Sequence, residues 1–480
     1  MLCLLAFCHC SCENWLDVKP RQQMEADVLF ERQEGFKDAL AAIYINMASE
    51  AMYGCEMTFG LVDVLGGVYP YTGTNYTYAK EYDYERPFVE GLVNAAWQQS
   101  YNTIAHINNL IDNLHKADKS IFSADNYNVI LGEAIGLRAF IHFDLLRLFA
   151  PSYKVNPTAM AIPYVTRYEY NVTPQYTVTA VLDSVMRDAN AALALLRESD
   201  PIYTGREITT KVDDGYLLDR QFNLNYYAVK AFMARVHMYR DQLGDAAQCA
   251  EEVINAGIAE WVKYANISAA HPESRDRTFT PEQIFVLNIT SLDRYVNARL
   301  VRVGSSGTVG PTAAIRLAFP LASLNTLYPD GDDWRKRFLY WLEDNSANPN
   351  ADRSCVKLGG VGAASLDFRT RLPVVRLPEM YLILAEASAD TNPARSAALL
   401  NELALNRGIG GGIVALDASV DVIREVIYQE YRREFPCEGQ MFYYHKRLDL
   451  PSIAGGYALF NKSKYVLPMP QEEIEFGQRK

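Results

Sequence analysis

One long apolar stretch constrains this chain more than any other segment, the sequence VILGEAIGLRAFIHFDLLRLFA at residues 129–150. Its apolar residues recur every three or four positions, and Phe140 and Phe143 widen the apolar face around the helix axis. A helix that is apolar on most of its circumference has to be covered by several neighbouring helices. Pro151 ends it, because proline lacks a backbone N–H and clashes with the preceding turn. We therefore expect the fold to be organised around this helix.

Charged side chains lie inside this and other apolar segments, and we expect them to form ion pairs. The long helix itself contains Glu133, Arg138, Asp144 and Arg147. Further along the chain the same mixture recurs, with Glu379, Glu386, Glu430, Glu434 and Glu438 among Arg407, Arg432, Arg433 and Arg447. Two carboxylates can hydrolyse a glycosidic bond. Carboxylates that lie beside arginines in apolar helices nevertheless favour buried ion pairing over catalysis.

The overall composition describes a globular protein and disfavours several classes of ligand. The chain has 480 residues, of which 49% are hydrophobic, so it can bury a large core. Its net charge of -12 argues against nucleic acid as a partner, because a phosphate-binding surface needs clustered Lys and Arg. The histidines are not spaced as the ligands of one metal ion, and no CxxC motif occurs among the cysteines after residue 12. We expect no metal, no redox pair and no cofactor.

The first twelve residues, MLCLLAFCHCSC, are uncharged and resemble the apolar part of a secretion signal. This stretch is too short to cross a bilayer. Cleavage after Ser11 would leave Cys12 as a new N-terminus for lipid attachment, and Cys10 is the alternative. A signal usually begins with Lys or Arg, so a wrongly assigned gene start is the competing interpretation. We predict a signal peptide at 1–11 and lipidation at Cys12.

Helical periodicity recurs through much of the chain. Helices are predicted at 36–52, 93–114, 129–150, 178–196, 225–243, 245–256, 377–389, 394–407 and 421–435. Short connections make neighbouring helices antiparallel, so the segments at 93–150, 225–256 and 377–407 should form helical hairpins. The predicted fold class is mainly all-α, a tetratricopeptide-like repeat scaffold without a strict period.

The region at 258–375 differs from the helical parts that flank it. Gln283 to Thr290, QIFVLNIT, reads as a strand, and glycines interrupt much of the chain after it, up to residue 362. We predict a loop-rich inserted subdomain at 258–375, between a helical half at 12–257 and a helical part at 376–480 that completes the same compact domain.

Several motifs together resemble the SusD/RagB family of outer-membrane lipoproteins. They are SCENWLDVKP after the signal, the WxxxYxxIxxIN pattern at 97–108, GEAxxLRAFxxFDLLRLFAP at 132–151, AVKAFMARVHMY, EMYLILAEA at 379–387, LNELALNRGI at 400–409, EYRREFPCEGQMFYYHKR at 430–447 and YVLPMPQEEI at 465–474. The resemblance covers nearly the whole mature chain. It implies a helical protein of four tetratricopeptide-like helix pairs, anchored to the outer membrane by lipid and exposed at the cell surface. Such proteins partner a SusC-like TonB-dependent transporter and pass it glycans or, in the RagB branch, peptides.

The tyrosine-rich segment at 68–87, VYPYTGTNYTYAKEYDYERP, is the leading candidate for a ligand site. Tyrosine rings stack on the apolar faces of sugars while polar neighbours bind the hydroxyl groups. The segment shows no helical periodicity, so residues 60–87 are predicted to be loop or short irregular structure with several exposed rings. The predicted ligand-binding residues are Asp63, Tyr69, Tyr71, Asn75, Tyr76, Tyr78 and Arg86, with Tyr295 and Trp334 in second rank. The alternatives are a packed loop that covers the core and a contact with the transporter.

Three functions are compatible with these observations. The leading one is a cell-surface glycan-binding lipoprotein that delivers oligosaccharides to its transporter. The runner-up is a RagB-like peptide-binding lipoprotein, since the aromatic segment favours sugars over peptides. A glycoside hydrolase ranks third, because no convincing acid/base pair is found, and the chain is predicted not to be an enzyme.

Overall fold

The computed structural model describes residues 28–211, 213–300, 313–342, 352–359, 367–455, 460–477 and 479. The described residues are mainly helical, which confirms the predicted fold class. The longer helices are α2 (Gln33–Met47), α5 (Pro87–Lys116), α6 (Asn126–Phe149), α7 (Val178–Ser199), α9 (Tyr226–Tyr239), α10 (Leu243–Asn255), α15 (Leu377–Ser388), α16 (Pro393–Leu405), α17 (Val420–Glu434) and α18 (Met441–Leu448). The shorter ones are α3 (Leu61–Leu65), α4 (Thr74–Lys80), α8 (Pro201–Thr204), α11 (Tyr264–Ile267), α12 (Leu292–Arg299), α13 (Leu321–Leu327), α14 (Trp334–Leu339) and α19 (Gln471–Phe476).

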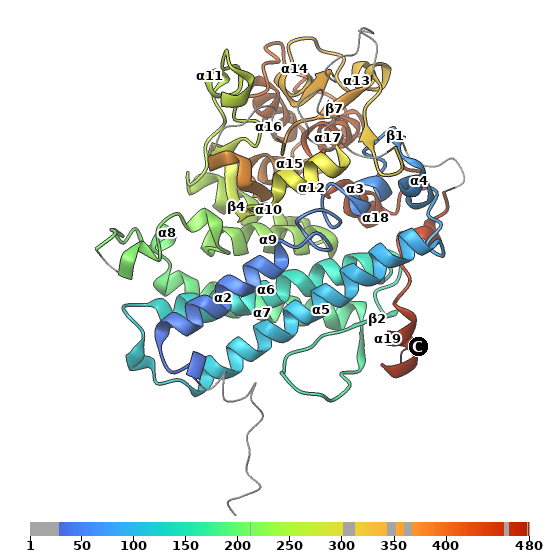
Figure 1. The fold of residues 1–480 in the computed structure, drawn as a ribbon. Coiled ribbons are helices and arrows are strands. Elements are labelled where there is room, and N and C mark those ends of the chain that lie inside the picture. The colour runs from blue at the N-terminus through green and yellow to red at the C-terminus, as the bar shows by residue number, and fades with distance from the viewer. Residues whose placement is uncertain are drawn as a thin grey trace, which may run out of the picture.

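The long helices pack on one another in the order of the chain (Figure 1). α5 packs on α6, α6 on α7, α7 on α9 and α9 on α10. α10 then packs on α15, which contacts both α16 and α17. The three predicted hairpins are α5–α6, α9–α10 and α15–α16, and each pair is in contact as expected. This stepwise stacking is the arrangement that helical repeats use to build a continuous core.

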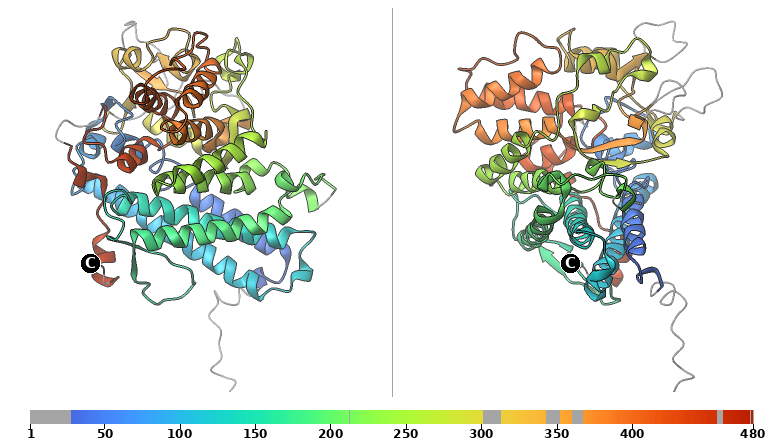
Figure 2. Two further views of the ribbon diagram at one scale, coloured as in Figure 1. Left: turned by 180° about the vertical axis from the view of Figure 1, so that it is seen from behind. Right: turned by 90° about the vertical axis from the view of Figure 1, so that its left-hand side faces the viewer.

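α6 is the central helix, as its sequence predicted. Every residue of α6 except Asn128 and Ile135 is buried. Seen from behind, α7 covers the side of α6 that faces away from α2 and α5 (Figure 2). Two glycines allow this close approach, because a Cβ at Gly132 would lie 2.9 Å from Leu196 and one at Gly136 would lie 3.3 Å from Ala192, both on α7.

The charges within α6 are paired, as expected. Arg138 donates to Asp188 on α7 at 2.7 Å. Glu133 pairs with Arg220 at 2.6 Å rather than with an arginine of its own helix. Arg220 precedes α9, so this ion pair joins two segments whose contact could not be predicted from their positions in the sequence.

Short antiparallel strand pairs connect the remaining segments. The strands are β1 (Tyr71–Thr72), β2 (Met160–Pro163), β3 (Gln175–Thr177), β4 (Gln283–Asn288), β5 (Leu317–Ala318), β6 (Tyr340–Leu342), β7 (Arg353–Cys355) and β8 (Arg371–Arg376), and they pair as β1–β5, β2–β3, β4–β8 and β6–β7. β4 confirms the strand predicted at 283–290. Its partner β8 leads directly into α15, while α10 precedes β4 and also packs on α15. The predicted domain limits at 257 and 375 stay a prediction.

The prediction for residues 60–87 was partly wrong, because this region contains the helices α3 and α4 as well as loops. These helices have five and seven residues, too few to produce a recognisable apolar period. In α4 only Tyr76 and Ala79 are buried. Cys12 and the predicted signal peptide lie outside the described residues. Among the helices that are described, none combines the length and the apolar character needed to cross a membrane.

The hydrogen bonds of His142 on α6 require a neutral imidazole ring. Its Nδ1 lies 2.8 Å from the carbonyl oxygen of Arg138, so this nitrogen donates, and Nε2 accepts the N–H of Val165 at 3.0 Å. The ring stacks on Tyr164 and is fully buried. Burial lowers the pKa of His142 from 6.5 to about 3. A proton on Nε2 would remove the acceptor for Val165.

We expect His142→Gln to reduce the loss of stability in acid. The unfolded chain takes up this proton near pH 6.5 and the folded chain only near pH 3, so the contribution is complete above pH 6.5 and is lost as pH falls through this window. Between pH 6 and 4.5 the free energy of unfolding of the parent should fall more steeply than that of the variant, by about 1.4 kcal/mol per pH unit. Urea unfolding at several pH values measures this difference, and exposed His106→Gln is the control. Equal slopes for the parent and His142→Gln would contradict the interpretation.

Candidate functional site

The tyrosine-rich segment is fixed to the region that follows β4. β1 pairs with β5, which places Tyr71 opposite Ala318. At the start of α4 the N–H of Gly73 donates to the carbonyl of Arg316 at 2.7 Å, and the N–H of Asn75 donates to that of Ala314 at 2.9 Å. A Cβ at Gly73 would lie 2.3 Å from the carbonyl oxygen of Ala313, so only glycine fits this approach. The segment is therefore an ordered part of the surface.

Most tyrosines of this segment are buried, which contradicts the expectation that several rings lie exposed. Tyr69 and Tyr76 are 1% and 0% exposed, and Tyr82 and Tyr84 are also buried. Their hydroxyls bind the interior: Tyr69 and Tyr82 donate to backbone carbonyls, each at 2.9 Å, and Tyr84 does so at 2.6 Å. The physical reason is that a phenol can enter a core when its hydroxyl finds an acceptor there.

Tyr76 belongs to a buried charge cluster beneath α4. Its hydroxyl donates to Glu56, with 2.8 and 2.9 Å to the two carboxylate oxygens. Arg299 of α12 donates to the same hydroxyl at 3.3 Å and to Glu56 at 3.0 Å. Tyr76 thus joins the tyrosine-rich segment to α12, and in this structure it has no surface to offer a ligand.

Asp63 also has a structural position rather than a ligand-facing one. Its carboxylate is fully buried and accepts the N–H of Cys437 at 2.7 Å and that of Gly439 at 3.0 Å. Burial raises the pKa of Asp63 well above its usual range, although the two N–H groups act in the opposite direction. Asp63 therefore holds the turn after α17 against α3.

The remaining candidates, Tyr71, Asn75, Tyr78 and Arg86, do reach the surface. Tyr71 is 37% exposed, and the guanidinium of Arg316 lies 5.1 Å from the centre of its ring. Tyr78 is half-buried, and the guanidinium of Arg86 lies 4.7 Å from its ring centre. Each ring is thus accompanied by a cation, with Asn75 between them in the chain. We call these five side chains the tyrosine–arginine surface.

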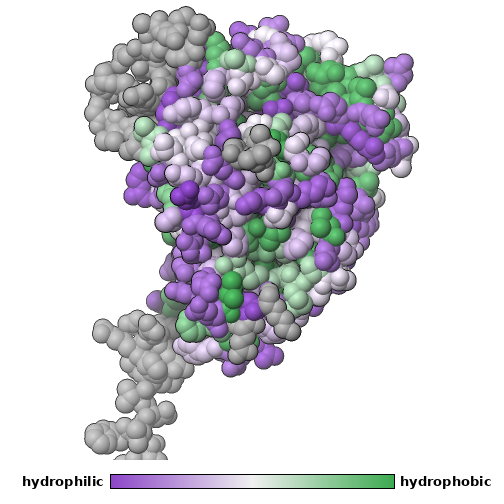
Figure 3. Space-filling model, turned by 90° about the vertical axis from the view of Figure 1, so that its right-hand side faces the viewer, coloured by the Kyte–Doolittle hydropathy of each residue, from purple (hydrophilic) through white to green (hydrophobic). Residues whose placement is uncertain are grey.

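Each ring–arginine pair brings together the two kinds of group that bind a sugar. Ring faces can cover the apolar side of a pyranose, while guanidinium and amide groups donate to its hydroxyls. Arg316 is also paired with Asp352 at 3.3 Å, and Arg86 with Asp83 at 2.9 Å, so each guanidinium has a carboxylate partner. Figure 3 shows the side of the molecule to the right in Figure 1, where a band of hydrophilic residues separates smaller apolar areas.

The second-rank candidates lie elsewhere. Tyr295 on α12 is buried, with the guanidinium of Arg294 5.0 Å from its ring centre. Trp334 is half-buried and packs on Tyr264, with ring centres 5.2 Å apart. Within the described part of the chain, neither has a ring contact with the tyrosine–arginine surface. Sequence reasoning missed Arg316, because only the long-range pairing of β1 with β5 brings it to Tyr71.

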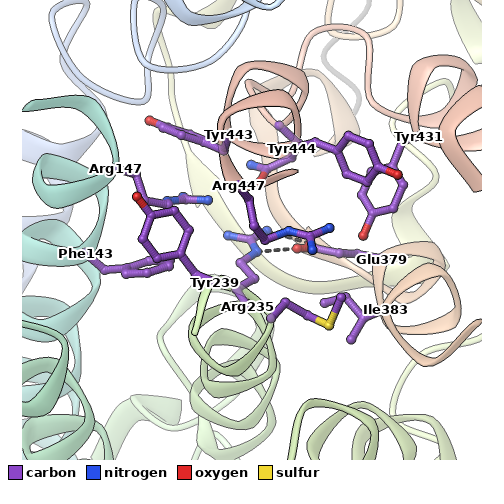
Figure 4. A pocket seen from close by; sticks show the side chains of 12 residues that line it. Phe143, Arg147, Arg235, Tyr239, Glu379, Ile383, Tyr431, Tyr443, Tyr444 and Arg447 are labelled. Carbon is purple, nitrogen blue, oxygen red and sulfur yellow. Dashed lines mark hydrogen bonds and ion pairs between the residues drawn. The ribbon is translucent and has the colours of Figure 1, made fainter. Parts of the chain in front are cut away.

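A polar chamber lies between α6, α9, α15 and α18 (Figure 4). Arg235 donates to Glu379 at 2.6 Å, and Arg447 pairs with Glu386 at 2.7 Å at one side. The hydroxyls of Tyr239 and Tyr443 have no hydrogen-bond partner among the described residues. The chamber volume of about 40 Å³ is enough for a few water molecules and too small for a sugar. It is therefore a structural junction between the two helical parts.

A larger groove of about 560 Å³ runs beside α17 and the segment at 448–454. Tyr428, Ile427 and Ile453 contribute its apolar lining, with Glu425 at its edge. The groove is large enough for a small ligand. No residue of the tyrosine-rich segment lines this groove, so the groove is a second candidate binding site beside the tyrosine–arginine surface.

Among the described residues no cluster of three His, Cys, Asp or Glu side chains could hold a metal ion.

The buried and exposed tyrosines should respond differently to truncation. We expect Tyr76→Ala to lower the free energy of unfolding by about 3–5 kcal/mol, because it opens a cavity and removes a partner of Glu56. Tyr71→Ala should lower it by only about 1 kcal/mol or less, because the change removes a partly exposed ring and its contact with Arg316. Urea unfolding at pH 7 compares the two. Equal losses would show that Tyr71 is a core residue.

Comparisons with known proteins give consistent matches. A family model described as "Starch-binding associating with outer membrane" matches residues 14–209, and the model of the SusD family matches residues 367–452. No curated protein sequence matches the chain.

Solved structures share the fold over nearly the whole chain. A SusD superfamily protein of Bacteroides thetaiotaomicron VPI-5482 has 21% identity and a TM-score of 0.71, covering 94% of this chain and 99% of that one. A SusD-like carbohydrate binding protein of Bacteroides vulgatus ATCC 8482 has 18% identity and a TM-score of 0.68, with 93% and 97% covered. A structure named as a laminarin binding SusD-like protein has 19% identity and a TM-score of 0.63, with 94% and 98% covered.

Proposed function

Because this chain belongs to the SusD/RagB family, we propose that it is a cell-surface glycan-binding lipoprotein that delivers oligosaccharides to a SusC-like TonB-dependent transporter. The family is one of carbohydrate-binding proteins associated with the outer membrane. The choice of ligand, the transporter and the lipid anchor at Cys12 are the parts that we add to this family assignment.

The tyrosine–arginine surface is the observation that supports this proposal. Its two rings lie at the surface on β1 and α4, and both elements are held by backbone hydrogen bonds to residues 314–318. Arg316 and Arg86 lie beside the rings as donors for sugar hydroxyls. A pre-formed platform of this kind loses little conformational entropy when it binds. Weak and oriented stacking is suited to a protein that must release its ligand to a transporter.

The surface favours binding over hydrolysis of the ligand. A glycosidase requires two carboxyl groups on opposite sides of the scissile bond. Two of the carboxylates near the tyrosine–arginine surface, Asp83 and Asp352, are each paired with one of its arginines. These pairs position the guanidinium groups, so the carboxylates act as supports for the donors.

We expect Tyr71→Ala combined with Tyr78→Ala to weaken glycan binding by about fivefold or more, since each ring contributes roughly 0.5–1.5 kcal/mol of stacking. Laminarin and a panel of other oligosaccharides would be titrated into the purified protein by calorimetry. The matched control is Tyr170→Ala combined with Tyr176→Ala, which removes two exposed tyrosines, one before β3 and one within it.

Two outcomes would contradict this assignment. Unchanged binding in the first variant, with loss in Tyr428→Ala, would move the site to the groove beside α17. Binding of a mixed peptide library without binding of any glycan would support the RagB-like alternative.

The lipid anchor is tested separately. We expect Cys12→Ala to release the protein from the membrane fraction, because the mature chain would then lack its attachment point. Cell fractionation followed by immunoblotting measures this change, and Cys10→Ala is the matched control. Retention of the Cys12 variant together with release of the Cys10 variant would assign the anchor to Cys10.

A further inference from the structure

Two cysteines that are far apart in the sequence lie side by side in the core. The Sγ atoms of Cys355 and Cys437 are 3.3 Å apart, although 82 positions separate them. Cys355 ends β7, and Cys437 lies in the turn between α17 and α18, two regions that are neighbours in Figure 1. Both side chains are fully buried. The sequence analysis predicted no redox pair, because the positions of the two cysteines in the sequence do not show that their sulfur atoms lie close together.

The surrounding backbone holds both cysteines in place. Cys355 is paired with Tyr340 across the β6–β7 ladder. The N–H of Cys437 donates to Asp63 at 2.7 Å, and its φ of +69° fits the tight turn there. Lys357 donates to the carbonyls of Glu434 and Pro436, which ties the strand after β7 to the same turn. The two sulfur atoms therefore face each other from fixed elements.

The remaining described cysteines differ from this pair. Cys55 has a carboxylate oxygen of Glu56 at 3.5 Å, and Cys249 lies on α10. In the described part of the chain neither has a sulfur atom of another cysteine beside it. They provide an internal reference for thiol chemistry in the same molecule.

We propose that Cys355 and Cys437 form a disulfide bond when the exported chain folds in an oxidising compartment. This inference rests on the export that forms part of the proposed function. The oxidant is a protein disulfide of the thiol–disulfide oxidoreductase class. A thiolate of the chain attacks that disulfide, the mixed disulfide forms, and the second thiolate of the chain displaces the reduced catalyst. Two thiol protons leave, and two electrons pass to the catalyst, which ends as a dithiol.

The charges around the pair favour ionisation of one of the two thiols once the chain has folded around them. Burial by itself raises the pKa of the Cys355 thiol, but the hydrogen bond from Cys437 and the N–H and ammonium groups of Lys357 outweigh burial and lower it. Burial raises the pKa of Cys437. In the folded chain the thiol of Cys355 therefore ionises more readily than that of Cys437. Formation of the bond requires the sulfur atoms to approach from 3.3 Å to about 2.05 Å.

The bond would fix the base of the proposed ligand surface. The Tyr69 hydroxyl lies 3.7 Å from the Cys437 sulfur, and the turn that contains Cys437 is held by Asp63. Closing the pair links β7 covalently to this turn and so restricts the unfolded chain. The bond would therefore stabilise the contact between the tyrosine-rich segment, β7 and the turn after α17.

The experiment compares thiols in the full chain purified in detergent from a host that exports it. The protein is denatured without reductant, alkylated and digested, and its peptides are identified by mass spectrometry. We expect alkylation of Cys55 and Cys249, and a linked peptide pair that contains Cys355 and Cys437. Reductant should lower the Tm of the parent by several degrees and leave that of Cys355→Ser unchanged. Cys249→Ser is the matched control and should respond as the parent does.

A second measurement separates this inference from the proposed function. The purified chain is reduced, unfolded and refolded with oxidised and reduced glutathione, which requires neither a membrane anchor nor a glycan. Formation of the Cys355–Cys437 bond supports the pairing even if Cys12 is not lipidated or no sugar binds. Full alkylation of both cysteines in the refolded and in the exported protein would overturn the proposal.

Discussion

A buried network of ion pairs around Arg376 and Glu434 is the interaction on which the assembly of the C-terminal half depends. Arg376 at the end of β8 contacts Glu282, Glu434 and Glu438, and Arg407 after α16 contacts Glu282 and Glu434. Arg335 of α14 adds contacts to Glu434 and Glu430. Arg376, Arg407 and Arg335 are fully buried, so their charges are compensated almost entirely by protein carboxylates.

This network determines which elements lie together. Burial by itself would raise the pKa of Glu434, but Arg407 and Arg376 hold it well below its usual range. Loss of one partner from such a set costs about 3–5 kcal/mol, because an uncompensated charge remains in the core. The aromatic rings of Phe279 and Trp261 lie over Arg407 and exclude water from it. The position of α14, β8, α16 and α17 is therefore specified by charge as well as by apolar packing.

The sequence predicted those parts of the fold whose signal is local. The helix α6 could be identified from a run of apolar residues, and α7 from the helical periodicity at 178–196. The burial of single residues in the tyrosine-rich segment could not be predicted in this way. Tyr69 and Tyr71 are two residues apart, and only Tyr69 is buried. The acceptors that draw Tyr69 and Tyr76 inward come from α3 and the turn before it, which the tyrosine pattern does not reveal. The same limit applies to Arg316 and Tyr71, which are brought together only by the β1–β5 pair.

The pairing of β4 with β8 has a consequence for how such a protein can diversify. Gln283 lies opposite Arg376, so the chain leaves the helical stack and returns to it at nearly the same point. Doubling the length of a flexible segment between two such fixed ends adds only about 0.6 kcal/mol of closure entropy. Insertions and deletions in the loops of this stretch can thus occur while α10 continues to pack on α15, provided that Arg299 and Arg335 keep their buried carboxylate partners. The architecture allows the repertoire of surface loops to evolve rapidly on a scaffold that does not have to change.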